Sequence, residues 1–209
     1  GARYPTHMAV FSRLAGSLGR RLRKRPGLPQ LRMVFAGPRP PDPGPALAPP
    51  YARMPFAPGD EPRWLALLHG DGEGGLGPWT LQRLQLDVLA FLVPDTQWFI
   101  WCGDAIAAGA GVYERSPAAW EVGWVATHPS HRGRGLGRHV VAAAVDTALR
   151  LPSRPVWLFT DDHRLPALRL YLRLGFVPDC HHPSHQGRWQ RLLGHLDPAL
   201  RSLATPWIR

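Results

Sequence analysis

The chain has 209 residues, enough for one domain with an appendage and a sizeable hydrophobic core. Its net charge of +10 is uneven, because residues 1–40 hold nine Arg and Lys and no acidic residue, which leaves 16 basic against 15 acidic residues in the rest. A nearly neutral body argues against specific nucleic-acid binding, two cysteines do not form a disulfide framework, and no apolar run is long enough to span a membrane. We therefore expect a cytoplasmic protein.

Residues 1–50 are predicted to precede the folded domain. Residues 1–7 are interpreted as a tag remnant ahead of Met8, and residues 8–50 as a basic extension ending in a Pro-rich linker. Apolar residues at helical spacing over 9–22, followed by a basic cluster, are compatible with a transit peptide or with an amphipathic helix that contacts a membrane surface or an acidic partner. A solvated extension is the favoured interpretation.

The folded domain is expected over residues 51–195, with a C-terminal tail at 196–209. Apolar alternation, aromatic runs and turn residues predict strands, while spacings of three and four predict helices. The predicted strands lie at 51–56, 97–102, 105–114, 119–127, 155–160, from 176 onward and at 187–193. The predicted helices lie at 61–68, 78–92, 139–150 and 165–174.

A glycine-rich turn separates the strand at 119–127 from the helix at 139–150. Its sequence is His128-Pro129-Ser130-His131-Arg132-Gly133-Arg134-Gly135-Leu136-Gly137-Arg138. Glycines at every second position allow backbone N–H groups to approach a ligand, and a helix N-terminus attracts anions. With three arginines nearby, the pattern indicates a phosphate or pyrophosphate site. The alternative is a simple turn with solvated arginines.

Two blocks of this sequence resemble the GNAT superfamily of acyl-CoA N-acyltransferases. Arg132-Gly133-Arg134-Gly135-Leu136-Gly137 is similar to the CoA signature Arg/Gln-x-x-Gly-x-Gly/Ala, and Ala167-Leu168-Arg169-Leu170-Tyr171-Leu172-Arg173-Leu174-Gly175-Phe176 is similar to Ala-x-x-x-Tyr-x-x-x-Gly-Phe. The order of predicted elements from about 51 to 193 agrees. The resemblance implies an α+β GNAT fold: a mixed, mostly antiparallel sheet of about seven strands, splayed between the fourth and fifth, with about four helices.

The resemblance also implies acetyl-CoA as co-substrate. Its pantetheine would lie along the strand edge and its pyrophosphate on the turn, with a backbone N–H near Val125 polarising the thioester carbonyl. The expected contacts are Val125, Ala126, Thr127, Arg132, Gly133, Arg134, Gly135, Leu136, Gly137 and Arg138. Arg164 stands where many members carry a cofactor-contacting Asn, which leaves that contact open, although Asp162 or His163 could serve nearby.

Two catalytic residues follow from the resemblance. Tyr171 is expected to be the general acid for the thiolate, although a packing role is the alternative. Glu121 occupies the position of a general base, and strand alternation predicts that it shares a face with Val125 and Thr127. An exposed carboxylate, a partner for an arginine, or deprotonation through water are equally open alternatives.

The sequence is therefore interpreted as an N-acetyltransferase acting on a primary amine of a small molecule or a peptide, as a monomer or homodimer. The alternatives are a transferase for a longer acyl chain, and a sensor or scaffold domain that binds acyl-CoA without turnover. Residues 180–185, Cys-His-His-Pro-Ser-His, are predicted to form a solvated loop near the acceptor, since a metal site would need a second pair of ligands.

Overall fold

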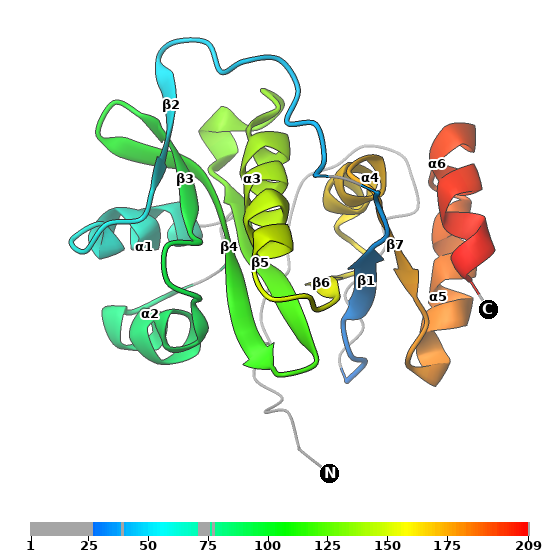
Figure 1. The fold of residues 1–209 in the computed structure, drawn as a ribbon. Helices are drawn as coiled ribbons and strands as arrows, with labels where there is room; N and C mark the ends of the chain where they lie inside the picture. Colours follow the sequence, from blue (N-terminus) through cyan, green and yellow to red (C-terminus); the bar gives the residue numbers. More distant parts are fainter. Residues whose placement is uncertain (1–26, 39, 71–75, 77, 209) are drawn as a thin grey trace.

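The computed structural model describes residues 27–38, 40–70, 76 and 78–208. They form a seven-stranded mixed sheet in the order β2-β3-β4-β5-β6-β1-β7, with helices packed against it (Figure 1). The strands are β1 (Leu31–Phe35), β2 (Tyr51–Pro55), β3 (Trp98–Cys102), β4 (Ala105–Ser116), β5 (Ala119–Thr127), β6 (Val156–Thr160) and β7 (Phe176–Asp179). The α-helices are α1 (Glu61–His69), α2 (Leu81–Asp87), α3 (Leu136–Arg150), α4 (Leu165–Arg173), α5 (Pro183–Leu193) and α6 (Pro198–Ala204), and the short 3-10 helices are η1 (Leu89–Phe91), η2 (Pro129–His131) and η3 (Thr205–Trp207).

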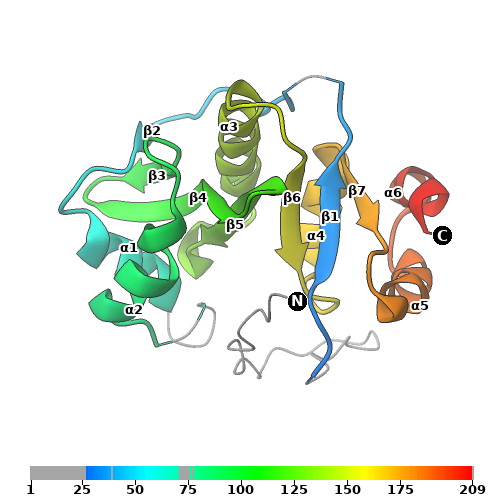
Figure 2. The same ribbon diagram turned by 60° about the horizontal axis from the view of Figure 1, so that its bottom comes forward.

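Two hydrophobic clusters hold the helices to the sheet. The larger joins α3, α4, α5 and α6 to the middle strands, and the smaller joins α1 and α2 to β3 and β4. Successive side chains of β4 point to opposite faces of the sheet, so this strand contributes to both clusters. Val112 packs in the larger cluster and Tyr113 in the smaller. In Figure 2, α1 and α2 lie beside β3, while α5 and α6 lie beyond β7 at the opposite end of the sheet.

The predicted splay between the strands at 119–127 and 155–160 is confirmed, and these strands are the parallel neighbours β5 and β6. These strands pair only at Trp120 with Val156 and at Glu121 with Trp157. From Val122 onward β5 has no partner residue in β6, while its other edge continues along β4 to Thr127. The backbone edge of β5 that faces β6 is therefore released from the sheet over the stretch that leads into the glycine-rich turn.

The predicted start of the domain at residue 51 is wrong. Strand β1 lies inside the sheet, antiparallel to both neighbours, with Met33 opposite Leu158 of β6 and Pro178 of β7. Leu31 and Met33 are fully buried. Five residues between a basic cluster and a proline-rich stretch give little local signal, and only pairing with distant strands makes them a strand. Residues 1–26, which include the predicted tag remnant and the basic cluster, lie outside the described residues.

The predicted strand at 187–193 is also wrong, because these residues belong to helix α5. The side chains buried along α5 are His185, Arg188, Trp189 and Leu192, which follow helical spacing. The seventh strand expected from this region is supplied by β1 instead. The predicted tail contains helix α6, whose Leu200 and Ala204 are buried, and the predicted helix at 78–92 is divided into α2 and η1.

Candidate functional site

The glycine-rich turn presents its backbone to open space. Gly133 and Gly135 have φ angles of 76° and 77°, in the left-handed region that favours glycine. A Cβ added to either would meet no atom within 4 Å. Helix α3 starts at Leu136, immediately after Gly135, so the free N–H groups of its first turn follow this open loop. These features fit a phosphate group, because both the N–H groups and the helix dipole favour an anion.

Gly137 marks the junction of three elements. A Cβ at this position would come within 3.3 Å of Leu170 Cδ2 in α4 and 3.6 Å of Thr127 Oγ1 at the end of β5. A methyl group here would already press on the end of the Leu170 side chain and touch Thr127, so the three elements lie close together at this position. The structure thus brings together the end of the splayed strand, the start of α3 and the helix that carries Tyr171.

The three arginines of the turn have different partners. Arg132 Nε donates to the carbonyl oxygen of Thr127 at 3.3 Å. Arg134 donates to the hydroxyl of Tyr51 at 3.0 Å. Arg138 forms an ion pair with Asp42 at 2.9 Å. Two of the three are thus held by residues that precede or begin β2, which sequence reasoning missed because no local pattern links positions so far apart.

Tyr171 lies on α4 in the larger hydrophobic cluster. Its side chain is 5% exposed and packs edge-to-face on Phe176, with ring centres 6.1 Å apart. Burial raises the pKa of Tyr171 to about 12, and the cationic Arg164 opposes that rise. Tyr171 therefore keeps its proton across the physiological pH range.

Glu121 faces the side of the sheet covered by α1 and α2. It lies opposite Tyr113, which belongs to the smaller cluster. The predicted match of its face with Val125 and Thr127 is wrong, because β5 contains an irregularity in its pairing with β4, and Trp124 has a φ of 50°. Between Gly123 and Ala126, β5 has one residue more than the paired stretch of β4. As in a β-bulge, this extra residue moves the following side chains to the opposite face of the sheet.

The Glu121 carboxylate is largely buried and has Arg115 as its ion-pair partner. Arg115 Nε lies 3.7 Å from its Oε1, and Gly123 follows it on the same strand face. Burial raises the pKa of Glu121, and the charge of Arg115 opposes this rise. Beyond the irregularity, Trp124 packs edge-to-face on Trp79 with ring centres 4.7 Å apart. Glu121 therefore lies on the α1–α2 side of the sheet, the side that also carries Tyr113, Trp79 and Trp124.

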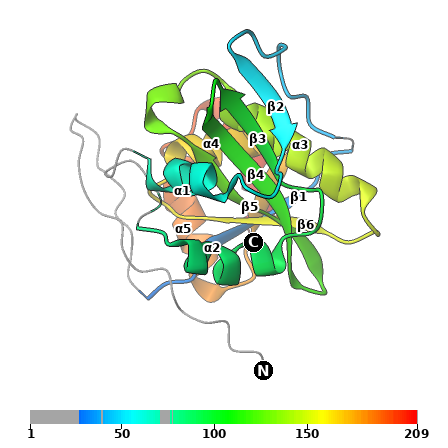
Figure 3. The same ribbon diagram turned by 90° about the vertical axis from the view of Figure 1, so that its left-hand side faces the viewer.

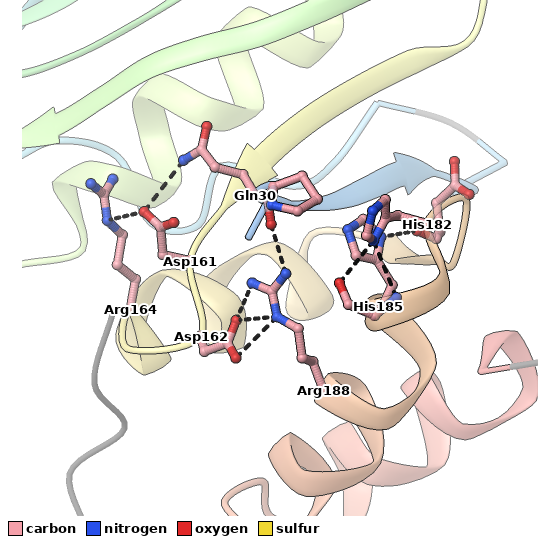
Figure 4. A network of polar contacts seen from close by, with 10 residues as sticks. Gln30, Asp161, Asp162, Arg164, His182, His185 and Arg188 are labelled. Atoms are coloured by element: carbon pink, nitrogen blue, oxygen red, sulfur yellow. Dashed lines mark hydrogen bonds and ion pairs between the residues drawn. The ribbon is translucent and has the colours of Figure 1, made fainter. Parts of the chain in front are cut away.

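A network of charged residues holds the loop between β6 and α4 (Figure 4). Arg164 lies 3.4 Å from Asp161, which also accepts a hydrogen bond from Gln30. Arg188 of α5 makes a two-pronged ion pair with Asp162, and both side chains are buried. Arg188 also donates to the carbonyl oxygen of Pro29 at 2.6 Å.

Both carboxylate oxygens of Asp162 are therefore engaged with Arg188. The same ion pair joins the segment before β1 to the loop that precedes the helix of Tyr171. Arg188 is a residue that sequence reasoning missed, because it was placed in a strand.

The histidines around residue 182 have structural roles. His182 caps α5 by accepting from Ser184 N at 3.1 Å, and His185 is fully buried with its Nδ1 3.2 Å from the carbonyl oxygen of Asp179. The predicted solvated loop is therefore wrong for residues 183–185, which form the first turn of α5, while His181 in the short connection before it is exposed. Within the described part of the chain, no group of three or more His, Cys, Asp or Glu is placed to hold a metal ion. Over the same residues, no helix combines the length and apolar character needed to cross a membrane.

Comparison with protein families and curated proteins gives concordant matches. A family model described as the acetyltransferase (GNAT) family matches residues 63–176. The mycothiol acetyltransferase of Pseudarthrobacter chlorophenolicus is 33% identical over 142 residues, which cover 59% of this chain and 41% of that protein. The mycothiol acetyltransferase of Corynebacterium glutamicum strain R is 32% identical over 102 residues, 48% of this chain and 35% of that protein. The chain thus spans less than half of these relatives.

Solved structures share the fold at lower identity. A GCN5-related N-acetyltransferase from Sphaerobacter thermophilus superposes with a TM-score of 0.54 at 21% identity, covering 73% of this chain and 50% of that one. The ribosomal-protein-S18-alanine N-acetyltransferase of Escherichia coli gives a TM-score of 0.50 at 17% identity, covering 60% and 76%. At these identities the likeness concerns the fold alone.

Proposed function

Because the chain belongs to the GNAT acetyltransferase family, we propose that it transfers the acetyl group of acetyl-CoA directly to a primary amine of a small molecule. The observation that carries this proposal is the junction at Gly137, where the open glycine turn, the released edge of β5 and the helix of Tyr171 meet. An acyl-CoA lying along that path would have its phosphates on the turn and its thioester at the splay.

The residues of this chain divide the work of holding the co-substrate. The N–H groups from about Arg134 to Arg138 would bind the pyrophosphate, with Arg132, Gly133, Gly135, Leu136 and Gly137 shaping the turn. The free edge of β5 at Val125, Ala126 and Thr127 would pair with the pantetheine, and a backbone N–H near Val125 would stabilise negative charge developing on the carbonyl oxygen. Acetyl-CoA supplies an activated acetyl group and a thiolate leaving group.

Glu121 is proposed to accept the proton that the amine must lose. The amine nitrogen forms the new C–N bond, the C–S bond breaks, one proton passes from nitrogen to Glu121, and one passes from Tyr171 to sulfur. The burial that raises the pKa of Glu121 supports this role, because a general base works best when its pKa approaches the working pH. Its position on the α1–α2 side would bring the amine in from that side.

Tyr171 is proposed to be the general acid, and the charge of Arg164 affects its pKa. A thiol has an ordinary pKa of about 8.5, so proton transfer from a tyrosine with a pKa of about 12 runs uphill. Arg164 lowers the pKa of Tyr171 and thereby reduces that difference. Arg164, at the position of the family's Asn, would thus assist the acid instead of contacting the cofactor as Asn does.

A small-molecule acceptor is favoured over a protein because the curated relatives described above are named for the small molecule mycothiol. The aromatic pair of Trp79 and Trp124 near Glu121 supports an acceptor that has an apolar or sugar-like face. The alternatives are a peptide amine and an acyl-CoA sensor without turnover.

The test is release of free CoA thiol from acetyl-CoA in the presence of a panel of amines: amino sugars, polyamines, amino acids and peptides with free N-termini. Amine-dependent thiol release with a small molecule supports the proposal. Thiol release with peptides in preference to small molecules would reject the small-molecule acceptor in favour of a peptide amine. Tight CoA binding with no release in the presence of any amine would favour the sensor.

A further inference from the structure

The stretch between β1 and β2 lies against the glycine-rich turn. It leaves β1, passes the start of α3 and enters the sheet at its outer edge as β2 (Figures 1 and 3). Asp42 of this stretch and Tyr51, the first residue of β2, contact the turn at two points. Both lie outside residues 63–176, which the family model matches, so neither contact follows from family membership.

Tyr51 connects two residues of the turn. Its hydroxyl oxygen accepts from Arg134 at 3.0 Å and lies 2.9 Å from His131 Nδ1, and its ring packs edge-to-face on His131. Since a guanidinium can only donate, the Tyr51 O–H is free to donate to His131, which requires Nδ1 without a proton. Burial and the nearby His128 and Arg134 lower the pKa of His131 and so favour this neutral form. One donor of Arg134 is used, and the other four are left for an anion.

Asp42 neutralises the other arginine. Its carboxylate lies 2.9 Å from Arg138 Nη2, and Arg138 Nε donates to its carbonyl oxygen at 2.9 Å. The backbone N–H of Gly44 donates to the second carboxylate oxygen of Asp42 at 2.8 Å, which stabilises the local backbone bend at residues 42–44. Arg138 stands in the first turn of α3, where the helix dipole itself attracts negative charge. A carboxylate of this chain therefore lies where the turn would attract a phosphate.

We propose that these two residues set the affinity of the turn for the phosphate groups of CoA, in opposite directions. Tyr51 positions Arg134 to bind a phosphate, and Asp42 is the counter-ion that a phosphate must displace from Arg138. The proposal rests on the proposed function, because it takes CoA to bind at this turn.

The test is the Kd of CoA for the intact chain and for two conservative variants. Tyr51→Phe keeps the ring and removes the hydroxyl, and it should weaken binding about five-fold, as expected for one hydrogen bond. Asp42→Asn removes the competing charge and should tighten binding about two- to three-fold, with an effect that shrinks at high salt. The matched control is Asp146→Asn, which breaks an exposed ion pair with Arg150 at the other end of α3 and should leave the Kd unchanged.

Two further measurements separate positioning from a structural effect. In the Arg134→Gln background, Tyr51→Phe should have little additional effect on the Kd, because the hydroxyl then has no guanidinium to position. Repeating the titrations with 3′-dephospho-CoA distinguishes the two sources of phosphate: effects that persist point to the pyrophosphate, and effects that vanish point to the 3′-phosphate.

The outcomes are distinguishable from failure of the proposed function. If the unmodified chain bound neither CoA nor 3′-dephospho-CoA, the cofactor assignment itself would fail. If it bound CoA but both variants left the Kd unchanged, or shifted it in the same direction, only the present inference would be overturned.

Discussion

Arg115 lies 3.7 Å from the Glu121 carboxylate and is surrounded by aromatic rings, with its guanidinium 4.8 Å from the centre of Phe91 and 5.9 Å from that of Tyr113. The aromatic faces and a hydrogen bond to the carbonyl oxygen of Asp87 fix the cation beside the carboxylate. The charge state of Glu121 thus depends on a residue that belongs to neither of the two family motifs.

The variant Arg115→Gln tests this dependence. Without the cation, burial alone acts on Glu121 and its pKa rises further, so a larger fraction of the base is protonated at any pH below the new value. The acid limb of the kcat/KM profile should therefore move to higher pH, while activity at high pH is largely retained. Arg83→Gln, which breaks an exposed pair with Asp87 on α2, is the control. A uniform loss at every pH would instead indicate that Arg115 binds the acceptor.

Replacing Tyr171 by phenylalanine tests the acid. The ring contact with Phe176 remains and only the hydroxyl is lost, so kcat should fall about 100-fold, in the range of a general acid. The Kd of CoA should change little, because the phosphates bind at the turn. Pre-steady-state release of the thiol gives the chemical step directly. An unchanged kcat would leave Tyr171 as a packing residue.

Removing only one partner of the buried ion pair between Arg188 and Asp162 should greatly reduce the stability of the fold. Arg188→Met leaves a buried carboxylate without its partner and should lower the free energy of unfolding by about 3–5 kcal/mol. Adding Asp162→Asn to this variant should recover part of that loss. Arg173→Met removes an exposed pair with Asp197 and should cost at most about 1 kcal/mol. Urea unfolding monitored by tryptophan fluorescence measures all three. Equal costs for the two single variants would contradict a buried, coupled pair.

His185 should make the stability fall at acid pH. Burial lowers the pKa of His185 in the folded state, with His181, His182 and Arg188 adding to the effect, so the unfolded chain binds the proton more readily. The free energy of unfolding should be insensitive to this group above the unfolded pKa of about 6.5 and should decrease as the pH falls below it.

The variant His185→Asn checks this expectation, since its amide can still donate toward the Asp179 carbonyl. Unfolding curves between about pH 5 and pH 7.5 should show a shallower pH dependence for the variant, across the histidine range. An unchanged slope in His185→Asn would assign the acid sensitivity to other groups.

The sequence was sufficient where the signal was local. The glycine turn, helix α3 and the block around Tyr171 are continuous stretches whose residues determine their own backbone, and they also carry the resemblance to a family. Their positions, the seven-stranded sheet and the splay of β5 from β6 could therefore be predicted.

Features that depend on distant residues could not be predicted. Strand β1 is defined by pairing with β6 and β7, and the contacts of Tyr51 and Asp42 with the turn join separate parts of the chain. The irregularity near Trp124 is not visible in the residue pattern of β5, yet it places Val125 and Thr127 on the face opposite to that of Glu121. The predicted strand at 187–193 is the end of helix α5, whose helical spacing becomes clear only when the buried residues His185 and Arg188 are included.

The place of β1 also has a consequence for how the chain reaches its folded state. Its Arg32 pairs with Asp179, 147 positions later, and both of its neighbouring strands come after every other strand of the sheet. Folding must therefore close a very long loop, which slows the final step in proteins dominated by non-local pairing. During synthesis, β1 precedes the six other strands described in this sheet and has both edges unpaired until β6 and β7 follow, a period in which an apolar strand is vulnerable to aggregation.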